Sequence, residues 1–405
     1  MGDSRLPLAG LRVLDLSRVL AGPWCTQQLA DLGAEVIKIE RPGRGDDTRA
    51  WGPPWLPGTQ ESAYFLSANR GKRSVAIDLA DPEGQALVRR LAACADVLIE
   101  NFKVGGLTAY GLDHASLQSD NPGLVYCSIT GFGQDGPYAA RAGYDFLIQG
   151  LGGLMSLTGQ PDAAGGEPTK VGVALTDIFT GLYAANAILA ALRRREQDGK
   201  GAYIDMALLD VQVGVLANQA LNYLTSANVP QRLGNAHPNI VPYQAFAAAD
   251  GHLIITVGND AQFRRLCEVL SLAGLADDPR FATNAARVAH RELLVAQLAV
   301  RLSERRRDDW LLALERAGVP SGPINTLDQV FDDPQVRHRG MQIERRGDDG
   351  RVAHLVGNPI KLDGERLGAP DMPPRLGEHT LAVLQGWLGP DAADWEALRE
   401  RGVIG

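Results

Sequence analysis

Residues 10–40, GLRVLDLSRVLAGPWCTQQLADLGAEVIKIE, decide the fold. Apolar residues run through 10–17 and 35–40, and these two runs predict strands. Between them, 24–32 predict a helix that ends at Gly33, a residue suited to the left-handed position after a helix. Strand, helix and strand form a βαβ unit, whose two strands are parallel and joined by a right-handed crossover. Ligands of such sheets bind beyond the carboxyl ends of the strands.

Further strand patterns at 74–78, 95–100, 123–130 and 203–207 extend this arrangement. The predicted fold class is therefore α/β, with a Rossmann-like parallel sheet of at least five strands in a large domain. The loops after the first, second and fourth strands carry the following candidate ligand-binding side chains: Arg18, Leu20, Ala21, Arg41, Asn101 and Phe102. Cations at strand ends favour an anionic, nucleotide-like ligand, and ordinary solvated loops are the alternative.

The composition changes near Ser226, which predicts a second, smaller α/β domain. We expect a large domain at 1–205, a linker helix at 206–227, the small domain at 228–325 and a C-terminal part at 326–405 that returns to the large domain. Within the small domain, 241–246 and 252–257 predict a hairpin through Asp250 and Gly251.

Charge and composition narrow the class of protein. The net charge is −8, with acidic and basic residues interspersed, so no nucleic-acid footprint is expected. We expect no membrane-spanning segment, and four scattered cysteines indicate a reduced, cytoplasmic protein. The seven histidines lack metal-ligand spacing, so no metal site is expected. No phosphate-binding P-loop motif is present. Residues 131–136 match the dinucleotide-binding pattern G-x-G-x-x-G, but Pro137 follows at once, which argues against a dinucleotide site.

Residues 171–195 predict a long apolar helix that begins near Thr176. We expect Thr176 to be the N-cap, with Asp177 next to it at the positive end of the helix dipole. Gly181 leaves room for a neighbouring backbone or a ligand. Because acidic residues are common at helix starts, this pattern alone does not name a reaction.

The chain resembles the class III CoA-transferases over essentially its whole length. The motifs that carry this resemblance are Leu14-Asp-Leu-Ser17, Ala21-Gly-Pro23, Gly33–Gly43, Asn69–Ser74, Glu100-Asn-Phe102, Ser128–Gly133 and Asp177-x-x-x-Gly181. Within the family, Arg141-Ala-Gly-Tyr-Asp145 and Ile240–Phe246 are most similar to members that act between succinyl-CoA and glutarate.

The resemblance implies that Asp177 is the nucleophile of the transfer. As an ionised carboxylate, it would attack an acyl-CoA thioester, giving first a mixed anhydride and then an aspartyl-CoA thioester. Backbone amides near Asp177 or in the loop at Gly234 and Asn235 are candidate donors to the oxyanions formed. No permanently bound cofactor is implied, because CoA thioesters are the substrates. The alternatives are a non-catalytic CoA-binding protein and an acyl-CoA racemase, although racemases of this superfamily have a histidine where this chain has Tyr144.

By position, the resemblance also implies contacts with CoA and with the acyl group. The predicted CoA-binding residues are Leu20, Ala21, Arg41, Asn69, Lys72, Asn101, Phe102 and Tyr144. The predicted substrate residues are Trp51, which lies at the family's gating position, and Arg232, Asn235 and His237 of the small domain. Glutarate is the first expected acceptor, with itaconate or hydroxymethylglutarate next, and the expected assembly is an interlocked homodimer.

Overall fold

The computed structural model describes residues 6–405, which group into two compact units. The first unit contains 6–153, 171–221 and 334–405, and the second contains 154–170 and 222–333. Residues 334–405 therefore belong to the first unit, although they follow the second unit in the sequence, whereas 326–333 of the predicted C-terminal part group with the second unit. Residues 154–170 group with the second unit, whereas the sequence pattern placed them in the large domain.

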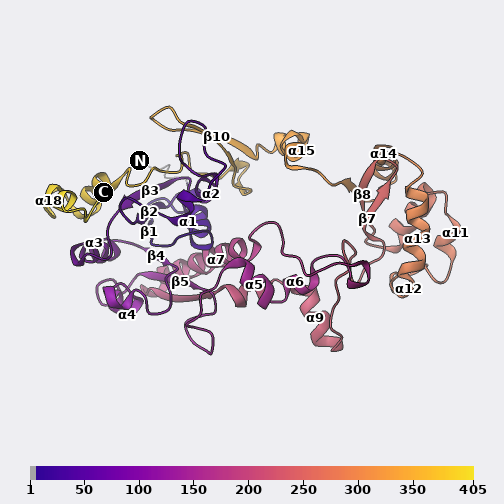
Figure 1. The fold of residues 1–405 in the computed structure, drawn as a ribbon, viewed down its shortest axis with the longest axis horizontal. Helices are drawn as coiled ribbons and strands as arrows, with labels where there is room; N and C mark the ends of the chain where they lie inside the picture. Colours follow the sequence, from indigo (N-terminus) through magenta and orange to yellow (C-terminus); the bar gives the residue numbers. More distant parts are fainter. Residues whose placement is uncertain (1–5) are drawn as a thin grey trace. The chain divides into compact units, whose positions relative to one another are not determined.

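A six-stranded sheet in the order β3-β2-β1-β4-β5-β6 forms the centre of the first unit (Figure 1). Every neighbouring pair is parallel, as the βαβ pattern predicts. The strands are β1 (Arg12–Asp15), β2 (Glu35–Glu40), β3 (Lys72–Ala76), β4 (Val97–Glu100), β5 (Val125–Thr130) and β6 (Ala202–Ala207). The strand order reverses between β1 and β4, and ligands of open α/β sheets bind in the crevice at such a point.

A different set of helices covers each face of the sheet. Successive residues of a strand point to opposite faces, so they belong to different cores. Leu14 and Ile37 belong to the core under α3 (Pro82–Ala93), α17 (Thr380–Leu388) and α18 (Trp395–Glu400). Val13 and Val36 belong to the opposite core, under α1 (Ala21–Asp31), α7 (Leu175–Asp198) and α8 (Leu208–Gly214). The sheet is therefore buried on both sides, as expected for parallel strands.

The helix predicted at 171–195 is α7, which packs closely against α1. A side chain at Gly181 would place its Cβ only 2.6 Å from the Ala21 carbonyl oxygen, so the close approach predicted at this glycine is confirmed. By length and composition alone, α7 is apolar enough to cross a membrane. Half of its apolar window is buried within the protein, which is typical of a core helix.

The predicted N-cap of α7 is wrong. Ala174 occupies that position, and Thr176 lies inside the helix. The Thr176 hydroxyl donates to Gln212 Oε1 at 2.6 Å and does not cap the helix. The cap comes from another helix.

The remaining elements of the first unit are short. They are η1 (Asp47–Ala50), α2 (Ala63–Ser67), η2 (Thr108–Tyr110), α4 (His114–Gln118), α5 (Asp145–Leu151), α16 (Pro334–His338), β10 (Gln342–Arg346), β11 (Val352–Val356), β12 (Lys361–Leu362) and β13 (Glu365–Arg366). Helix α9 (Ala217–Ser226) runs across the boundary between the two units in the sequence.

The second unit is a small α/β body around an antiparallel sheet, β7-β8-β9. The predicted hairpin is confirmed, since β7 (Tyr243–Ala248) pairs with β8 (Gly251–Thr256). Trp310 and Phe281 are fully buried in its core. The other elements are α6 (Leu154–Leu157), η3 (Asp162–Ala164), α10 (Asp260–Val269), α11 (Gly274–Asp277), α12 (Asn284–Ala289), α13 (Arg291–Leu302), α14 (Arg307–Arg316), β9 (Ser321–Pro323) and α15 (Leu327–Asp332).

Candidate active site

A cavity of about 180 Å³ lies in the first unit at the carboxyl ends of β1, β4 and β5. This is the position that the strand order indicates for a ligand. It brings together six of the predicted site residues: Leu20, Ala21, Asn101, Phe102, Tyr144 and Asp177. They come from segments far apart in the sequence, namely the loops after β1 and β4 and the starts of α5 and α7.

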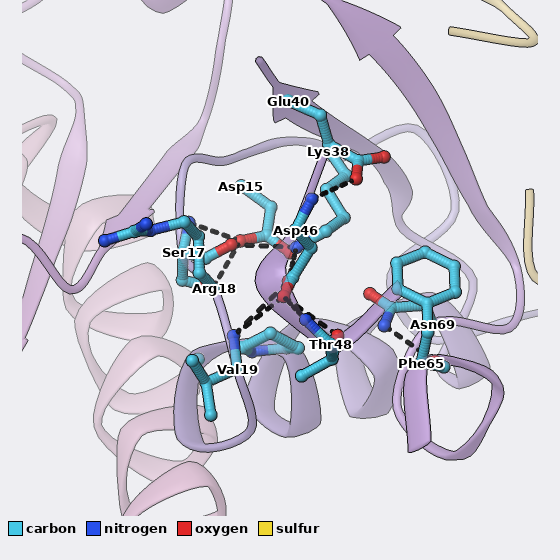
Figure 2. Close-up of polar contacts among 12 residues, drawn as sticks. Asp15, Ser17, Arg18, Val19, Lys38, Glu40, Asp46, Thr48, Phe65 and Asn69 are labelled. Carbon is cyan, nitrogen blue, oxygen red and sulfur yellow. Dashed lines mark hydrogen bonds and ion pairs between the residues drawn. The ribbon is translucent and has the colours of Figure 1, made fainter. Parts of the chain in front are cut away.

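The turn between β1 and α1 forms one wall and is held in an unusual conformation. Val19 has φ 71°, a left-handed value that is unfavourable for a β-branched residue. Its amide donates to both carboxylate oxygens of Asp46 at 3.3 Å, and Asp46 is paired with the buried Lys38 ammonium at 2.9 Å (Figure 2). Asn101 fastens the same turn to β4, because its side chain accepts from the Arg18 amide and donates to the Arg18 carbonyl.

Asp177 lies in the first turn of α7 and lines the cavity. Asp145, the first residue of α5, caps this turn: its Oδ1 accepts from the amide of Thr176 at 2.9 Å and from that of Asp177 at 3.4 Å. Burial, together with the nearby Asp145 carboxylate, raises the pKa of Asp177 to about 7. The resemblance implied an ionised carboxylate, whereas a group with this pKa carries a proton part of the time at pH 7.

The amides at the start of α7 and the Gly234 amide, which were predicted as oxyanion donors, already have partners. Those of Thr176 and Asp177 donate to Asp145, and those of Leu175 and Ile178 donate to backbone carbonyls. In the second unit, the Gly234 amide donates to the Gly159 carbonyl at 3.0 Å. The prediction that these groups stabilise an oxyanion thus lacks support in this arrangement.

Three cations also line the cavity: Arg18, Lys103 and Arg141. The Arg18 guanidinium lies 5.8 Å from the centre of the Phe102 ring, and that of Arg141 lies 3.8 Å from the Tyr138 ring. Arg141 was not among the predicted site residues. Its sequence signal is its place four residues before Asp145, within the motif Arg141–Asp145 that carries part of the resemblance.

Arg41, Asn69 and Lys72 do not line this cavity. Lys72 opens β3, away from the carboxyl edge, and its buried ammonium donates to Asp15, Asn69 and the Pro23 carbonyl at 2.9–3.1 Å. The Asn69 amide also donates to the Phe65 carbonyl at 2.8 Å (Figure 2). Both side chains are therefore occupied within the protein, and the geometry does not support their predicted contact with CoA. Arg41 is exposed directly after β2.

Trp51 is 44% exposed and packs edge-on against Tyr64 of α2, with 5.0 Å between the ring centres. Tyr64 was not predicted as a site residue. Burial, together with the negative charges of Asp177 and Asp145, raises the pKa of Tyr64 to about 12. Trp51, the predicted gating residue, therefore contacts a tyrosine whose pKa is affected by the charge of Asp177.

Arg232, Asn235 and His237 lie in one loop of the second unit. Arg232 pairs with Asp162, and Asn235 is exposed. His237 Nδ1 accepts from the Asn239 amide at 3.1 Å, and burial and the Arg291 guanidinium lower the pKa of His237. The imidazole is therefore largely neutral at pH 7, which makes it a hydrogen-bonding group rather than a cation.

Comparisons with known proteins agree with this arrangement. The family model described as "CoA-transferase family III" matches residues 8–380. A succinate–glutarate CoA-transferase of Agrobacterium fabrum is 53% identical over 388 residues, which cover 95% of this chain and 96% of that protein. The human succinyl-CoA:glutarate CoA-transferase is 44% identical, over 98% of this chain and 90% of that protein. The crystal structure of a CaiB/BaiF family protein from Brucella suis aligns with a TM-score of 0.83 at 55% identity, covering 94% of this chain and 99% of that one. The chain is therefore a family III CoA-transferase.

Proposed function

We propose that the protein transfers CoA from succinyl-CoA to glutarate. One observation carries the proposal: the titratable carboxyl group of Asp177 lines a cavity that also contains cationic side chains and lies where the strand order of the sheet reverses. The substrates follow from the similar proteins, since those of Agrobacterium fabrum and human are named for succinate or succinyl-CoA and glutarate. Itaconate and hydroxymethylglutarate are the next candidate acceptors.

The chemistry requires only the carboxylate form of Asp177. Its oxygen bonds to the thioester carbonyl carbon of succinyl-CoA, the C–S bond breaks, and CoA leaves as a thiolate, giving an aspartyl–succinyl anhydride. The thiolate then attacks the aspartyl carbonyl, which releases succinate and leaves an aspartyl-CoA thioester. Glutarate attacks this thioester to form a second anhydride, and the released thiolate attacks its glutaryl carbonyl. Glutaryl-CoA leaves, and the Asp177 carboxylate is regenerated.

The rest of the cavity suits a CoA thioester. Arg18, Lys103 and Arg141 supply positive charge for phosphate groups. Phe102 offers an apolar ring for the adenine or the pantetheine arm, and the Leu20–Ala21 backbone closes the wall beside it. Arg41 remains a candidate for a more distant phosphate contact, since its side chain is exposed.

The acyl-binding residues stay a prediction. Trp51 is proposed to cover the acyl group, and Arg232, Asn235 and His237 to contact the distal carboxylate. Arg232 already pairs with Asp162, so a substrate would have to share or replace that partner. We further propose a cytoplasmic homodimer, for which the family resemblance is the support.

Trapping the anhydride tests the reaction. Incubation with succinyl-CoA and hydroxylamine should convert Asp177 to its hydroxamate, detected by peptide mass spectrometry, and a panel of acids should give glutaryl-CoA as the main product. Asp177→Ala should lose CoA transfer by about a thousandfold or more. Asp210→Asn is the matched control, because Asp210 also lies in the first turn of a helix, α8, and should retain activity. Full activity of Asp177→Ala would exclude the mechanism, and no transfer to any dicarboxylate would exclude the substrate class.

A further inference from the structure

The first turn of α7 depends on a carboxylate from another helix. Its N-cap residue, Ala174, has no side-chain acceptor, so the free amides at the helix start need an outside partner. Asp145 of α5 supplies it through Oδ1, at 2.9 Å from the Thr176 nitrogen and 3.4 Å from the Asp177 nitrogen.

The other oxygen of Asp145 extends the connection to the segment that enters α7. Oδ2 accepts from the Gln149 side chain at 2.7 Å, and Gln149 Oε1 accepts from the Val171 amide at 3.0 Å. Gln149 is fully buried. One side of α5 therefore fixes both Val171, which precedes the helix, and the turn that carries Asp177.

Asp145 also places a second negative charge beside Asp177. Among the residues described, neither carboxylate has an ion-pair partner within 4 Å. Both carboxylates oppose the ionisation of Tyr64 of α2 and help to raise its pKa. The remaining charged or titratable groups around the cavity are Arg18, Lys103, Arg141 and Tyr144.

We propose that Asp145 is a positioning residue for Asp177: it fixes the first turn of α7, and its charge sets the pH range in which Asp177 can attack a thioester. This inference rests on the proposed function, in which Asp177 is the nucleophile. Only ionised Asp177 attacks, so activity falls as pH decreases through the pKa of this group. Removing the neighbouring charge lowers that pKa and moves the fall to lower pH.

Two substitutions separate charge from positioning. Asp145→Asn keeps an oxygen acceptor for the two amides of α7 but removes the charge and turns the Oδ2 acceptor of Gln149 into a donor. The acidic limb of kcat/KM for succinyl-CoA should therefore shift down by roughly 0.5–1 pH unit, and the plateau kcat should fall less than in the alanine variant. Asp145→Ala removes the acceptor as well, and the plateau kcat should fall about 10- to 100-fold with a smaller change in KM. Rates of CoA transfer would be measured from pH 5.5 to 8.5 on the full-length protein.

Asp81→Asn provides the matched control. Asp81 caps α3 by accepting from the Glu83 amide at 2.8 Å, so this variant changes a similar cap away from the cavity and should keep the native pH profile. Because Asp145→Asn is isosteric, the shift of the limb can be measured even if the alanine variant does not fold. An unshifted limb in Asp145→Asn, with Asp177→Ala inactive, would overturn this inference and leave the proposed function standing. An active Asp177→Ala would overturn both.

Discussion

The raised pKa of Asp177 connects the stability of the protein with its chemistry at the scale of one residue. Burial and Asp145 raise it to about 7 from a reference value of 3.8. Between these two values the folded state keeps a proton that the unfolded chain releases, so the stability contributed by this site falls as pH rises from about 4 to about 7. Above pH 7 the folded protein holds a charge in a place that disfavours it.

Replacing this group by a neutral amide should therefore favour stability more at high pH than at low pH. We expect the stability of Asp177→Asn relative to the native protein to rise between pH 4.5 and pH 8 by about 1–3 kcal/mol, a range reduced for partial solvent screening. Urea unfolding at both pH values measures the difference. Asp210→Asn, at an exposed first-turn position, should change neither value. A relative stability of Asp177→Asn that stays level or falls between the two pH values would contradict the argument.

The position of Asp177 could be predicted from sequence, whereas its partners could not. An acidic residue before a long apolar run predicts a helix start, and the run is visible locally. Asp145 lies 32 residues earlier, and nothing local shows that its carboxylate replaces Thr176 as the cap. For Lys72, the role predicted from sequence is not supported by the structure. A lysine near a strand resembles a phosphate ligand in sequence, but this lysine is buried against Asp15, and that contact depends on packing between distant segments.

At the scale of elements, the β1–α1 turn depends on a buried ion pair. Asp46 accepts from the amides of Val19 and Thr48 and pairs with Lys38, and both charged side chains are fully buried. A strained residue such as Val19 persists only when surrounding contacts hold it. The hydrophobic runs predicted the two parallel strands, and Gly33 predicted the end of the helix between them. The strain at Val19 in the β1–α1 turn could not be predicted, because it depends on Asp46, which lies in the loop after β2.

Asp46→Ala should destabilise the protein by about 3 kcal/mol or more, since it leaves the Lys38 ammonium buried without its carboxylate. The neighbouring Asp47 is the control. Its partners, Arg18 at 3.0 Å and Arg44 at 3.2 Å, are exposed, so Asp47→Ala should change stability by less than about 1 kcal/mol. Urea unfolding at pH 7 compares the two variants. Equal effects would show that the ion pair does not hold the turn.

At the scale of the whole molecule, the first unit exposes apolar side chains on three neighbouring helices. They include Leu147 and Leu151 of α5, Leu182 and Tyr183 of α7, and Val213 of α8, between 42% and 53% exposed. These helices pack on one another, and exposed apolar side chains gathered on neighbouring elements are typical of an interaction surface. Helix α7 thus has one side in the core and another at the surface, which the periodicity of so apolar a sequence could not separate.

We propose that a second copy of the chain covers this surface in the homodimer, and sedimentation can test this directly. The native protein should sediment at twice the mass of one chain, because burying these side chains in a second copy removes apolar area from water. An arginine in place of Leu147 or Leu182 introduces a charge that would be desolvated in the interface, so these variants should sediment as monomers or weaker dimers. Val300→Arg is the control, since Val300 is 67% exposed on α13 of the second unit and lies outside these three helices. A native monomer at micromolar concentration, or arginine variants that all remain dimers, would contradict the assignment of this surface to a second copy.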